Sequence, residues 1–336
     1  MLKTVNAYII RTSLMTPENT LIQHDQIYGE SRIDIPVAID VIRSATFQRL
    51  KRINQYGVPD EFYHLPNFSR YEHSIGVMLL LKHLGASEEE QLAGLLHDVS
   101  HKAFSHVYDW VAGSAKHEDS QDKGHMQYIE NSELAAILSA HGYKVEKITD
   151  YHRFGLLERE SPDLCADRVD YALRELKPEL AREIFKGLTV FNGQIVCKNL
   201  QRAAKFGRAF LKLQVEHWGG YEAVVRYHIF SGILKLALEK GIITPENFMT
   251  DDDFVTTKLK ESGDEEISRK LNFLRQKPLP KTKEGITVHK KFRYIDPLFI
   301  NNGKLLRLSE ADEKFLETLE KAREENLKGV IVPNIN

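Results

Sequence analysis

Residues 95–106 read LLHDVSHKAFSH and place three histidines and an aspartate within ten positions at the end of an apolar run. Imidazole and carboxylate groups resist burial unless they are hydrogen-bonded, paired or bound to a metal ion. The preceding segment, SEEEQLAGLLHD (87–98), starts with a capping box formed by Ser87 and Glu90 and keeps its leucines at helical spacing. It therefore predicts a helix that delivers His97 and Asp98 at its C-terminal end.

A second helix is predicted just before this one. In SRYEHSIGVMLLLKHLG (69–85), Ser69 is the N-cap, Gly85 is the stop, and His73 begins a buried apolar stripe. A lone histidine in such a place is more often a hydrogen-bonded core residue than a metal ligand. Its neighbourhood in the fold decides between the two.

A third helix is expected to open at Ser161-Pro162 and to continue through DLCADRVDYALREL (163–176). One side is apolar, and the other carries Asp167, Asp170, Tyr171 and Arg174 at helical spacing. We interpret Asp170 and Arg174 as a solvated i, i+4 pair. Asp167 is the residue of this face that we expect to have a chemical role.

Four of these side chains match the needs of a divalent cation. Imidazole nitrogen and carboxylate oxygen are the ligands of hard or borderline metals, and two of each leave coordination positions free for water and substrate. His73, His97, Asp98 and Asp167 could supply this set. Iron, manganese, cobalt, nickel, magnesium and zinc are all compatible with it.

Composition limits the classes of function. The chain has 336 residues, 42% of them hydrophobic, and a net charge of -2, which is typical of a globular protein and not of one that coats nucleic acid or anionic membranes. Its two cysteines are too few for a disulfide framework. The sequence shows no apolar segment of membrane-spanning length and no signal-peptide core. We expect a soluble, cytoplasmic protein without a membrane partner, and we do not expect it to bind nucleic acid.

The predicted fold is mainly α. LTVFNGQIVC (188–197) reads as a small β-hairpin around Asn192-Gly193, and beyond Gly241 the sequence becomes rich in turns and charges. A last helix is expected from Ser309 toward Gly329. We predict an N-terminal extension (1–35), a helical domain (36–240) and a mixed C-terminal lobe (241–336).

Several segments resemble the HD-domain metal-dependent phosphohydrolases, and among these the deoxynucleoside-triphosphate triphosphohydrolases. The matching text is FQRLKRINQYG (47–57), SRYEHSIGV (69–77), AGLLHDVSHKAFSHVYD (93–109), KHE (116–118) and ADRVDYALRE (166–175). The resemblance implies an HD-domain helical core and hydrolysis of dNTPs to deoxynucleoside and triphosphate. It also implies a homo-oligomer.

The resemblance implies a role for each matching residue. The metal ligands would be His73, His97, Asp98 and Asp167. The residues around the reacting phosphate would be His101, His106, Asp109 and His117, with His106 as a candidate proton donor oriented by Asp109. Phosphate and sugar would be held by Gln55, Arg70 and Arg168, and the ribose by Tyr171 and Glu175. Tyr56 could stack on the base or belong to the core.

The match departs from the triphosphate enzymes at one functional run, Arg-x3-His-x3-Tyr. The segment VEHWGGY keeps His217 and Tyr221 for substrate binding, but Leu213 stands in the place of the arginine. A contact to a terminal phosphate is then missing. Arg43 likewise replaces an acidic residue that reads an activating nucleotide, so we do not transfer that allosteric site. The alternatives are a 5′-nucleotidase or other phosphomonoesterase, and, outside the enzymes, a metal-stabilised nucleotide-binding scaffold or sensor.

Overall fold

Helices α3 (Arg70–His83) and α4 (Glu88–Leu96) form where the sequence predicts them, and they pack against each other. The computed structural model describes residues 20–113 and 124–335. Ser69 and Glu72 form a complete capping box at the start of α3. Ser87 caps α4, whereas the Glu90 carboxylate accepts hydrogen bonds from backbone N–H groups of residues 156–157, so the second predicted box is only half formed.

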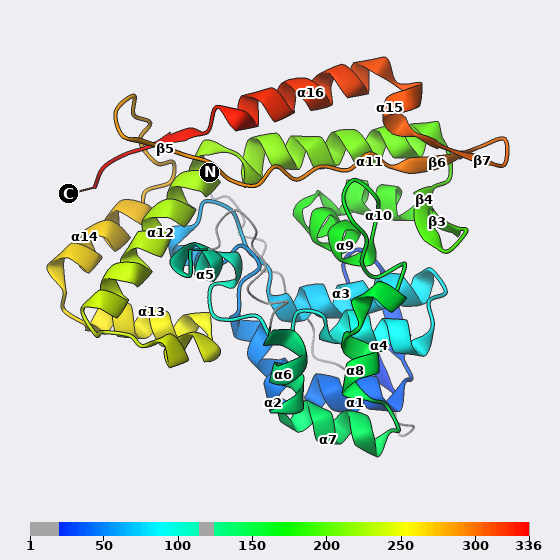
Figure 1. Ribbon diagram of the computed structural model, residues 1–336, viewed down its shortest axis with the longest axis horizontal. Coiled ribbons are helices and arrows are strands. Elements are labelled where there is room, and N and C mark those ends of the chain that lie inside the picture. The colour runs from blue at the N-terminus through cyan, green and yellow to red at the C-terminus, as the bar shows by residue number, and fades with distance from the viewer. Residues whose placement is uncertain (1–19, 114–123, 336) are drawn as a thin grey trace, which may run out of the picture.

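The predicted fold class, mainly α with a small hairpin and a mixed C-terminal part, is confirmed (Figure 1). None of the described helices is both long enough and apolar enough to span a membrane. Besides α3 and α4, the described α-helices are α1 (Pro36–Arg43), α2 (Ala45–Gln48), α5 (Ser105–Val111), α6 (His125–Glu130), α7 (Glu133–Ala140), α8 (Val145–Thr149), α9 (Ala166–Glu175), α10 (Pro178–Lys186), α11 (Leu200–Leu213), α12 (Tyr221–Glu239), α13 (Asp252–Glu261), α14 (Glu265–Leu274), α15 (Leu308–Ala311) and α16 (Glu313–Leu327). Short 3₁₀ turns are η1 (Arg49–Arg52), η2 (Asp60–Phe62), η4 (Tyr151–Arg153) and η6 (Pro245–Met249), and η5 (Gln214–Trp218) is a π-helical turn.

The strands form small sheets at the edges of the helical body. They are β1 (Leu21–Asp25), β2 (Gly29–Ile33), β3 (Leu188–Phe191), β4 (Gln194–Cys197), β5 (Ile286–Val288), β6 (Leu298–Asn301), β7 (Lys304–Arg307) and β8 (Val330–Val332). The predicted hairpin β3–β4 turns at Asn192 and Gly193, whose positive φ angles of 51° and 72° suit a type I′ turn. Pairing of β4 with β6 extends it to the order β3-β4-β6-β7.

The predicted start of the third helix at Ser161-Pro162 is wrong. α9 begins at Ala166, and Cys165 before it is extended. The N–H groups of Ala166 and Asp167 donate to backbone carbonyls of residues 156–157, which satisfies donors that a helix start leaves open. Residues 161–163 form a turn and a bend instead, and Leu164 pairs with Ile195 of β4.

Two apolar clusters make up the core. One centres on α3, α4, α9 and α11 and includes Leu21 of β1 and Phe315 of α16. The other centres on α12 and combines Phe62 and Phe104 with Leu259 of α13. Each cluster therefore draws on residues from both sides of Gly241. The division of the chain at positions 36 and 241 stays a prediction, and these cores are continuous across position 241.

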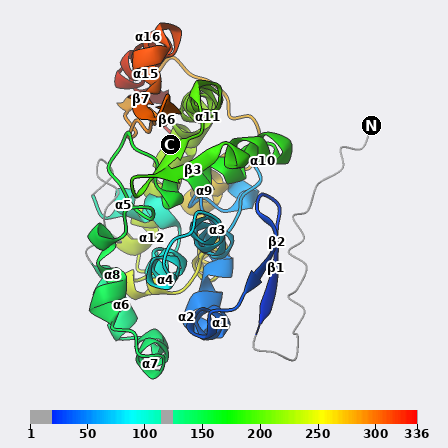
Figure 2. The same cartoon turned by 90° about the vertical axis from the view of Figure 1, so that its right-hand side faces the viewer.

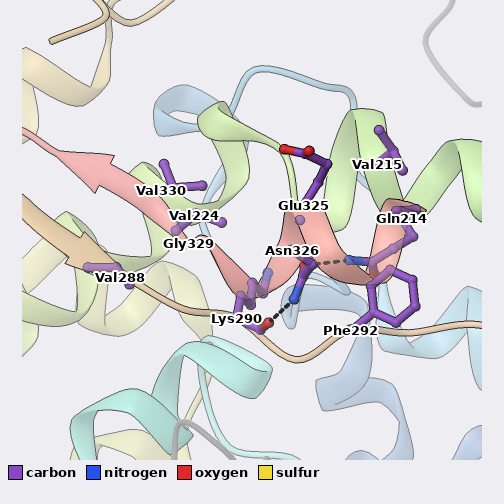
Figure 3. Close-up of a pocket in the computed structure, with 12 residues that line it drawn as sticks. Gln214, Val215, Val224, Val288, Lys290, Phe292, Glu325, Asn326, Gly329 and Val330 are labelled. Carbon is purple, nitrogen blue, oxygen red and sulfur yellow. Dashed lines mark hydrogen bonds between the residues drawn. The ribbon is translucent and has the colours of Figure 1, made fainter. Parts of the chain in front are cut away.

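The C-terminal segment is fastened to the end of α11. α16 lies beside α11 along the upper edge of the molecule in both views (Figures 1 and 2). The Asn326 side chain accepts a hydrogen bond from Gln214 and donates one to the carbonyl of Lys290 (Figure 3). These two hydrogen bonds hold η5, the turn on which His217 lies, against the C-terminal segment.

Asp252 ties the C-terminal half to the segment that follows the His-Asp pair. Its side chain is buried and accepts hydrogen bonds from the N–H of Phe104 (2.7 Å) and of Asn54 (2.9 Å). Phe104 and Ser105 have positive φ angles of 67° and 45°, a region that side chains disfavour. The aspartate therefore holds a strained turn next to His101 and His106.

Replacing Asp252 with alanine is expected to lower the free energy of unfolding by about 2–6 kcal/mol, because it leaves two buried N–H groups without an acceptor and each costs about 1–3 kcal/mol. Urea denaturation would measure this change. Asp253→Ala is the matched control, since its side chain is exposed, and it should stay within about 0.5 kcal/mol of wild type. Equal midpoints for the two variants would contradict this account.

Candidate metal centre and its surroundings

The four predicted metal ligands converge in the structure from three separate parts of the chain. His73 lies near the start of α3, His97 is the C-cap of α4 and Asp98 follows it, and Asp167 lies in the first turn of α9. The Nε2 atoms of the two histidines are 3.2 Å apart. Asp167 Oδ1 lies 2.9 Å and 3.6 Å from them, and the nearest Asp98 oxygens lie 3.7 Å and 3.5 Å away.

The opposite nitrogen of each imidazole is held by a fixed partner. His73 Nδ1 donates to Asp170 Oδ2 (2.7 Å), and His97 Nδ1 donates to the carbonyl of Gly94 (2.7 Å). A proton on Nδ1 leaves the Nε2 lone pair facing the carboxylates, which is the arrangement that metal-binding histidines need. The donor set and its supports therefore fit a divalent cation.

The electrostatics of the cluster favour positive charge. Burial alone would lower the pKa of His97, but Asp98 and Asp167 outweigh it and raise that pKa to about 9. Burial likewise opposes ionisation of Asp98, yet Arg70 and His97 hold its pKa well below the usual range. The Asp167 side chain remains 28% exposed, so the cluster is open on the side where a substrate would enter.

A second group of possible ligands, Glu158, Cys165 and Asp167, competes with the cluster of His73, His97 and Asp98 for Asp167. Here the Arg168 guanidinium lies 3.1 Å from Cys165 Sγ and 3.8 Å from the Glu158 carboxylate. Burial also raises the pKa of the Cys165 thiol, whereas a metal requires the thiolate. This group suits a metal less well than the four-residue cluster.

Arg70 lies beside the cluster and is almost fully buried. Its guanidinium donates to Asp98 Oδ2 (2.6 Å) and Ser105 Oγ (3.0 Å). Its remaining nitrogen, Nη2, is buried and has no hydrogen-bond partner among the described residues. A buried cationic donor of this kind is well suited to a phosphate oxygen.

Two of the predicted catalytic histidines lie near the cluster, with His101 next to Asp98 and His106 next to His101. His101 Nε2 lies 3.2 Å from Asp98 Oδ1, and its ring is 5.3 Å from that of His106. Burial, helped by the charge of Arg70, lowers the pKa of His101 to about 3, so this imidazole is neutral at pH 7. His106 Nδ1 donates to Asp109 Oδ2 (3.1 Å), and the Asp109 carboxylate is buried. His117 lies outside the described residues.

Of the residues expected to contact the sugar, some have polar atoms left for a substrate, and others are already hydrogen-bonded within the protein. The Tyr171 ring lies 6.4 Å from that of His73, and Gln55 Oε1 is buried without a partner among the described residues. The Glu175 carboxylate is already engaged by His217 Nδ1 (2.5 Å) and Trp218 Nε1 (2.8 Å). The ribose contact predicted for Glu175 would therefore compete with bonds inside the protein.

Two predicted substrate contacts are directed elsewhere. The Arg168 guanidinium donates to the carbonyls of Asp163 (2.7 Å) and Arg159 (3.1 Å), so it braces the loop before α9. The Tyr221 hydroxyl donates to the carbonyl of Pro280 (2.6 Å). His217 lies on the π-helical turn η5, and Gly219-Gly220 separate this turn from α12, which begins at Tyr221. The two side chains therefore do not share one helical face.

A cavity of about 610 Å³ lies at the C-terminal end of α9. Its wall includes Tyr56, Phe68, Glu175, Leu213 and His217. Tyr56 is mostly buried, with its ring 4.7 Å from His217 and 5.6 Å from Phe68, so it belongs to an aromatic cluster that also borders this cavity.

The interpretation of Asp170 and Arg174 as a solvated pair is wrong. They are paired, with Arg174 Nε 2.7 Å from Asp170 Oδ2, but both are buried, and Asp170 also binds His73. A polar helix face looks the same in sequence whether water or another helix covers it. The available signal was the position of Asp170, three residues after a predicted ligand and so on the same face of α9.

Comparison with known proteins agrees with this arrangement. A model of the HD domain family matches residues 70–181. The uncharacterized protein YdhJ of Bacillus subtilis is 37% identical, over 92% of this chain and 97% of that protein. The metal-dependent phosphohydrolase cns2 of Cordyceps militaris is 29% identical, over 87% of this chain and 88% of that protein.

More distant likenesses extend over less of the sequence or concern the fold alone. The deoxynucleoside triphosphate triphosphohydrolase SAMHD1 of Danio rerio is 29% identical, over 40% of this chain and 25% of that protein. The crystal structure of a phosphohydrolase from Bacteroides thetaiotaomicron superposes with a TM-score of 0.66 at 18% identity, over 88% of this chain and 95% of that one. The family match covers all four predicted ligands, and the full-length relatives extend it to most of the sequence. The chain belongs to the HD-domain phosphohydrolases, which depend on a divalent metal ion.

Proposed function

We propose that this chain hydrolyses nucleotides at the cluster of His73, His97, Asp98 and Asp167, and that its preferred substrate is a nucleoside 5′-monophosphate. The resemblance to the deoxynucleoside-triphosphate triphosphohydrolases favours a deoxynucleotide. The four side chains would hold the cation, which supplies Lewis-acid activation of the phosphoryl group and of the attacking water. Arg70 would donate to a phosphate oxygen from Nη2, which has no hydrogen-bond partner in the described part of the chain. His106, oriented by Asp109, would donate the proton that the departing 5′ oxygen requires.

The choice of a monophosphate rests on the contacts that a polyphosphate would need. Leu213 stands in the cavity wall where the triphosphate enzymes have arginine, and Arg168 is bound to its own loop. A triphosphate carries about two more negative charges than a monophosphate, and guanidinium groups are the usual partners for them. Hydrolysis of dNTPs to deoxynucleoside and triphosphate is the second candidate, favoured by the motifs shared with the triphosphohydrolases.

A product analysis separates the two candidates. The metal-loaded protein is incubated with matched panels of dNMPs, NMPs and dNTPs, and orthophosphate and triphosphate are quantified. We expect orthophosphate from monophosphates, with kcat/KM at least about tenfold above that for dNTPs, a difference of about 1.4 kcal/mol. Triphosphate as the main product would favour the second candidate instead.

Leu213→Arg tests the same point within the chain. The new guanidinium should raise kcat/KM for dNTPs relative to dNMPs, whereas Leu213→Met, which adds no charge, should leave that ratio near the wild-type value. An unchanged ratio in both variants would show that position 213 does not set the number of phosphates. The cytoplasmic location and the homo-oligomeric state stay predictions, and light scattering would test the latter.

A further inference from the structure

Behind His73, on the side away from the other ligands, lies a buried network that reaches the N-terminal hairpin. Asp170 Oδ2 accepts from His73 Nδ1 and from Arg174 Nε, each at 2.7 Å. Arg174 Nη2 also lies 2.8 Å from Asp25 Oδ2, and the Tyr28 hydroxyl donates to Asp170 Oδ1 at 2.7 Å. Asp25 and Tyr28 are at the β1–β2 turn, which packs along the edge of the helical body (Figure 2).

The network leaves Asp170 little freedom to move. Its side chain has no exposed surface, and its two oxygens receive donors from a histidine, an arginine and a tyrosine. Asp25 is fixed in turn, because its other oxygen accepts the N–H groups of Ile27 and Tyr28. A carboxylate held in this way fixes the plane and the tautomer of the imidazole it binds.

Helix α3 is shaped to receive the Asp170–Arg174 pair. Gly76 lies three residues after His73, and a Cβ atom there would come within 1.9 Å of Arg174 Nη2 and 2.2 Å of Asp170 Oδ1. Glycine inside a helix is destabilising relative to alanine by about 0.5–1 kcal/mol. Here the missing side chain makes room for the network, so the same helix carries a metal ligand and the space for its support.

We propose that the β1–β2 turn is a functional part of the metal centre, and that Tyr28 and Asp25 are positioning residues that act on His73 through Asp170 and Arg174. The hairpin segment is thus more than an extension before the helical domain. This inference rests on the proposed metal centre. It adds that Tyr28 and Asp25, which precede the residues they contact in α9 by 142 and 149 positions, help to set the affinity of that centre for its cation.

The direct test measures metal affinity of chelator-treated protein, by competition between Mn²⁺ binding and a fluorescent indicator. Tyr28→Phe removes a single donor to Asp170, and we expect the Kd for Mn²⁺ to rise about tenfold, at the lower end of the 10–100-fold typical for partners of metal-bound histidines. Tyr294→Phe, which removes the hydroxyl of a ring that stacks on Phe292 outside this network, should leave the Kd unchanged. The melting temperature, measured in parallel, separates loss of positioning from loss of fold.

Gly76→Ala should have a larger effect, about 100-fold in Kd, because the new methyl group displaces both Asp170 and Arg174. Gly232→Ala is its matched control. Gly232 also lies in a helix, but no atom of residues 20–113 or 124–335 lies within 4 Å of the place that its new methyl group would take. If Gly76→Ala does not fold, Tyr28→Phe alone decides.

Wild-type Mn²⁺ affinity in folded Tyr28→Phe would overturn the inference while leaving the metal centre intact. A wild-type protein that binds no Mn²⁺ would instead overturn the metal centre and this inference with it. The two failures are therefore distinguishable by the behaviour of the wild-type protein.

Discussion

Asp167→Ala is expected to lose its bound metal and to lower kcat/KM for nucleotides by more than about 100-fold, beyond the loss typical for residues that only support a ligand. Asp167 Oδ1 faces the Nε2 atoms of both His73 and His97. Asp98, the other carboxylate of the cluster, is already bound by Arg70, so it cannot replace Asp167 without rearrangement. Elemental analysis and a nucleotide hydrolysis assay on the same preparations would measure both effects.

The control for this variant is Asp150→Ala, which removes an exposed carboxylate. It should keep the metal content and the activity of the wild type. An Asp167→Ala protein that retains stoichiometric metal and full activity would show that the cation is bound elsewhere. Circular dichroism on both variants would show whether the helical fold is kept.

His106→Gln is expected to lower kcat for nucleotides by about 10²–10⁴-fold, the usual contribution of a positioned proton donor, without changing metal content. His101 Nε2 lies 3.2 Å from the ligand Asp98, whereas the His106 imidazole is held by Asp109, at 3.1 Å. The loss should depend on the leaving group. A sugar hydroxyl leaves only with a proton, whereas p-nitrophenolate is stable as an anion, so hydrolysis of p-nitrophenyl phosphate should fall much less.

The leaving-group comparison separates proton donation from phosphate binding. An equal loss for both substrates would contradict the role of His106 as the acid and would assign it to binding. Asp109→Asn should show the same dependence on leaving group in a weaker form, because Asp109 orients the imidazole without touching the substrate. His152→Gln, which changes an exposed histidine, should behave as the wild type with both substrates.

The helices that carry the ligands could be predicted because their signals are local. Ser69 and Ser87 are N-caps within a few residues of the apolar stripes they start, and both cap in the structure. That His73, His97 and Asp167 meet in space does not follow from periodicity. It could be expected only because the motifs resemble those of a known family.

What the sequence did not reveal depends on contacts between distant segments. The Tyr28–Asp170 and Asp25–Arg174 contacts join residues 142 and 149 positions apart, so the polar face of α9 could not be recognised as buried. The role of Asp252 could not be predicted for the same reason, because the two N–H groups that it accepts belong to residues 148 and 198 positions away. The direction of Tyr221 depends on one π-helical turn, which the pattern His-x3-Tyr does not signal.

We expect one cation to bind between His73, His97, Asp98 and Asp167. Anomalous diffraction from crystals soaked in Mn²⁺ tests it most directly. We predict an anomalous peak at bonding distance, about 2 Å, from both Nε2 atoms and from an oxygen of each aspartate. A strong peak at Glu158 and Cys165, or anywhere else, with no peak between these four side chains, would contradict it.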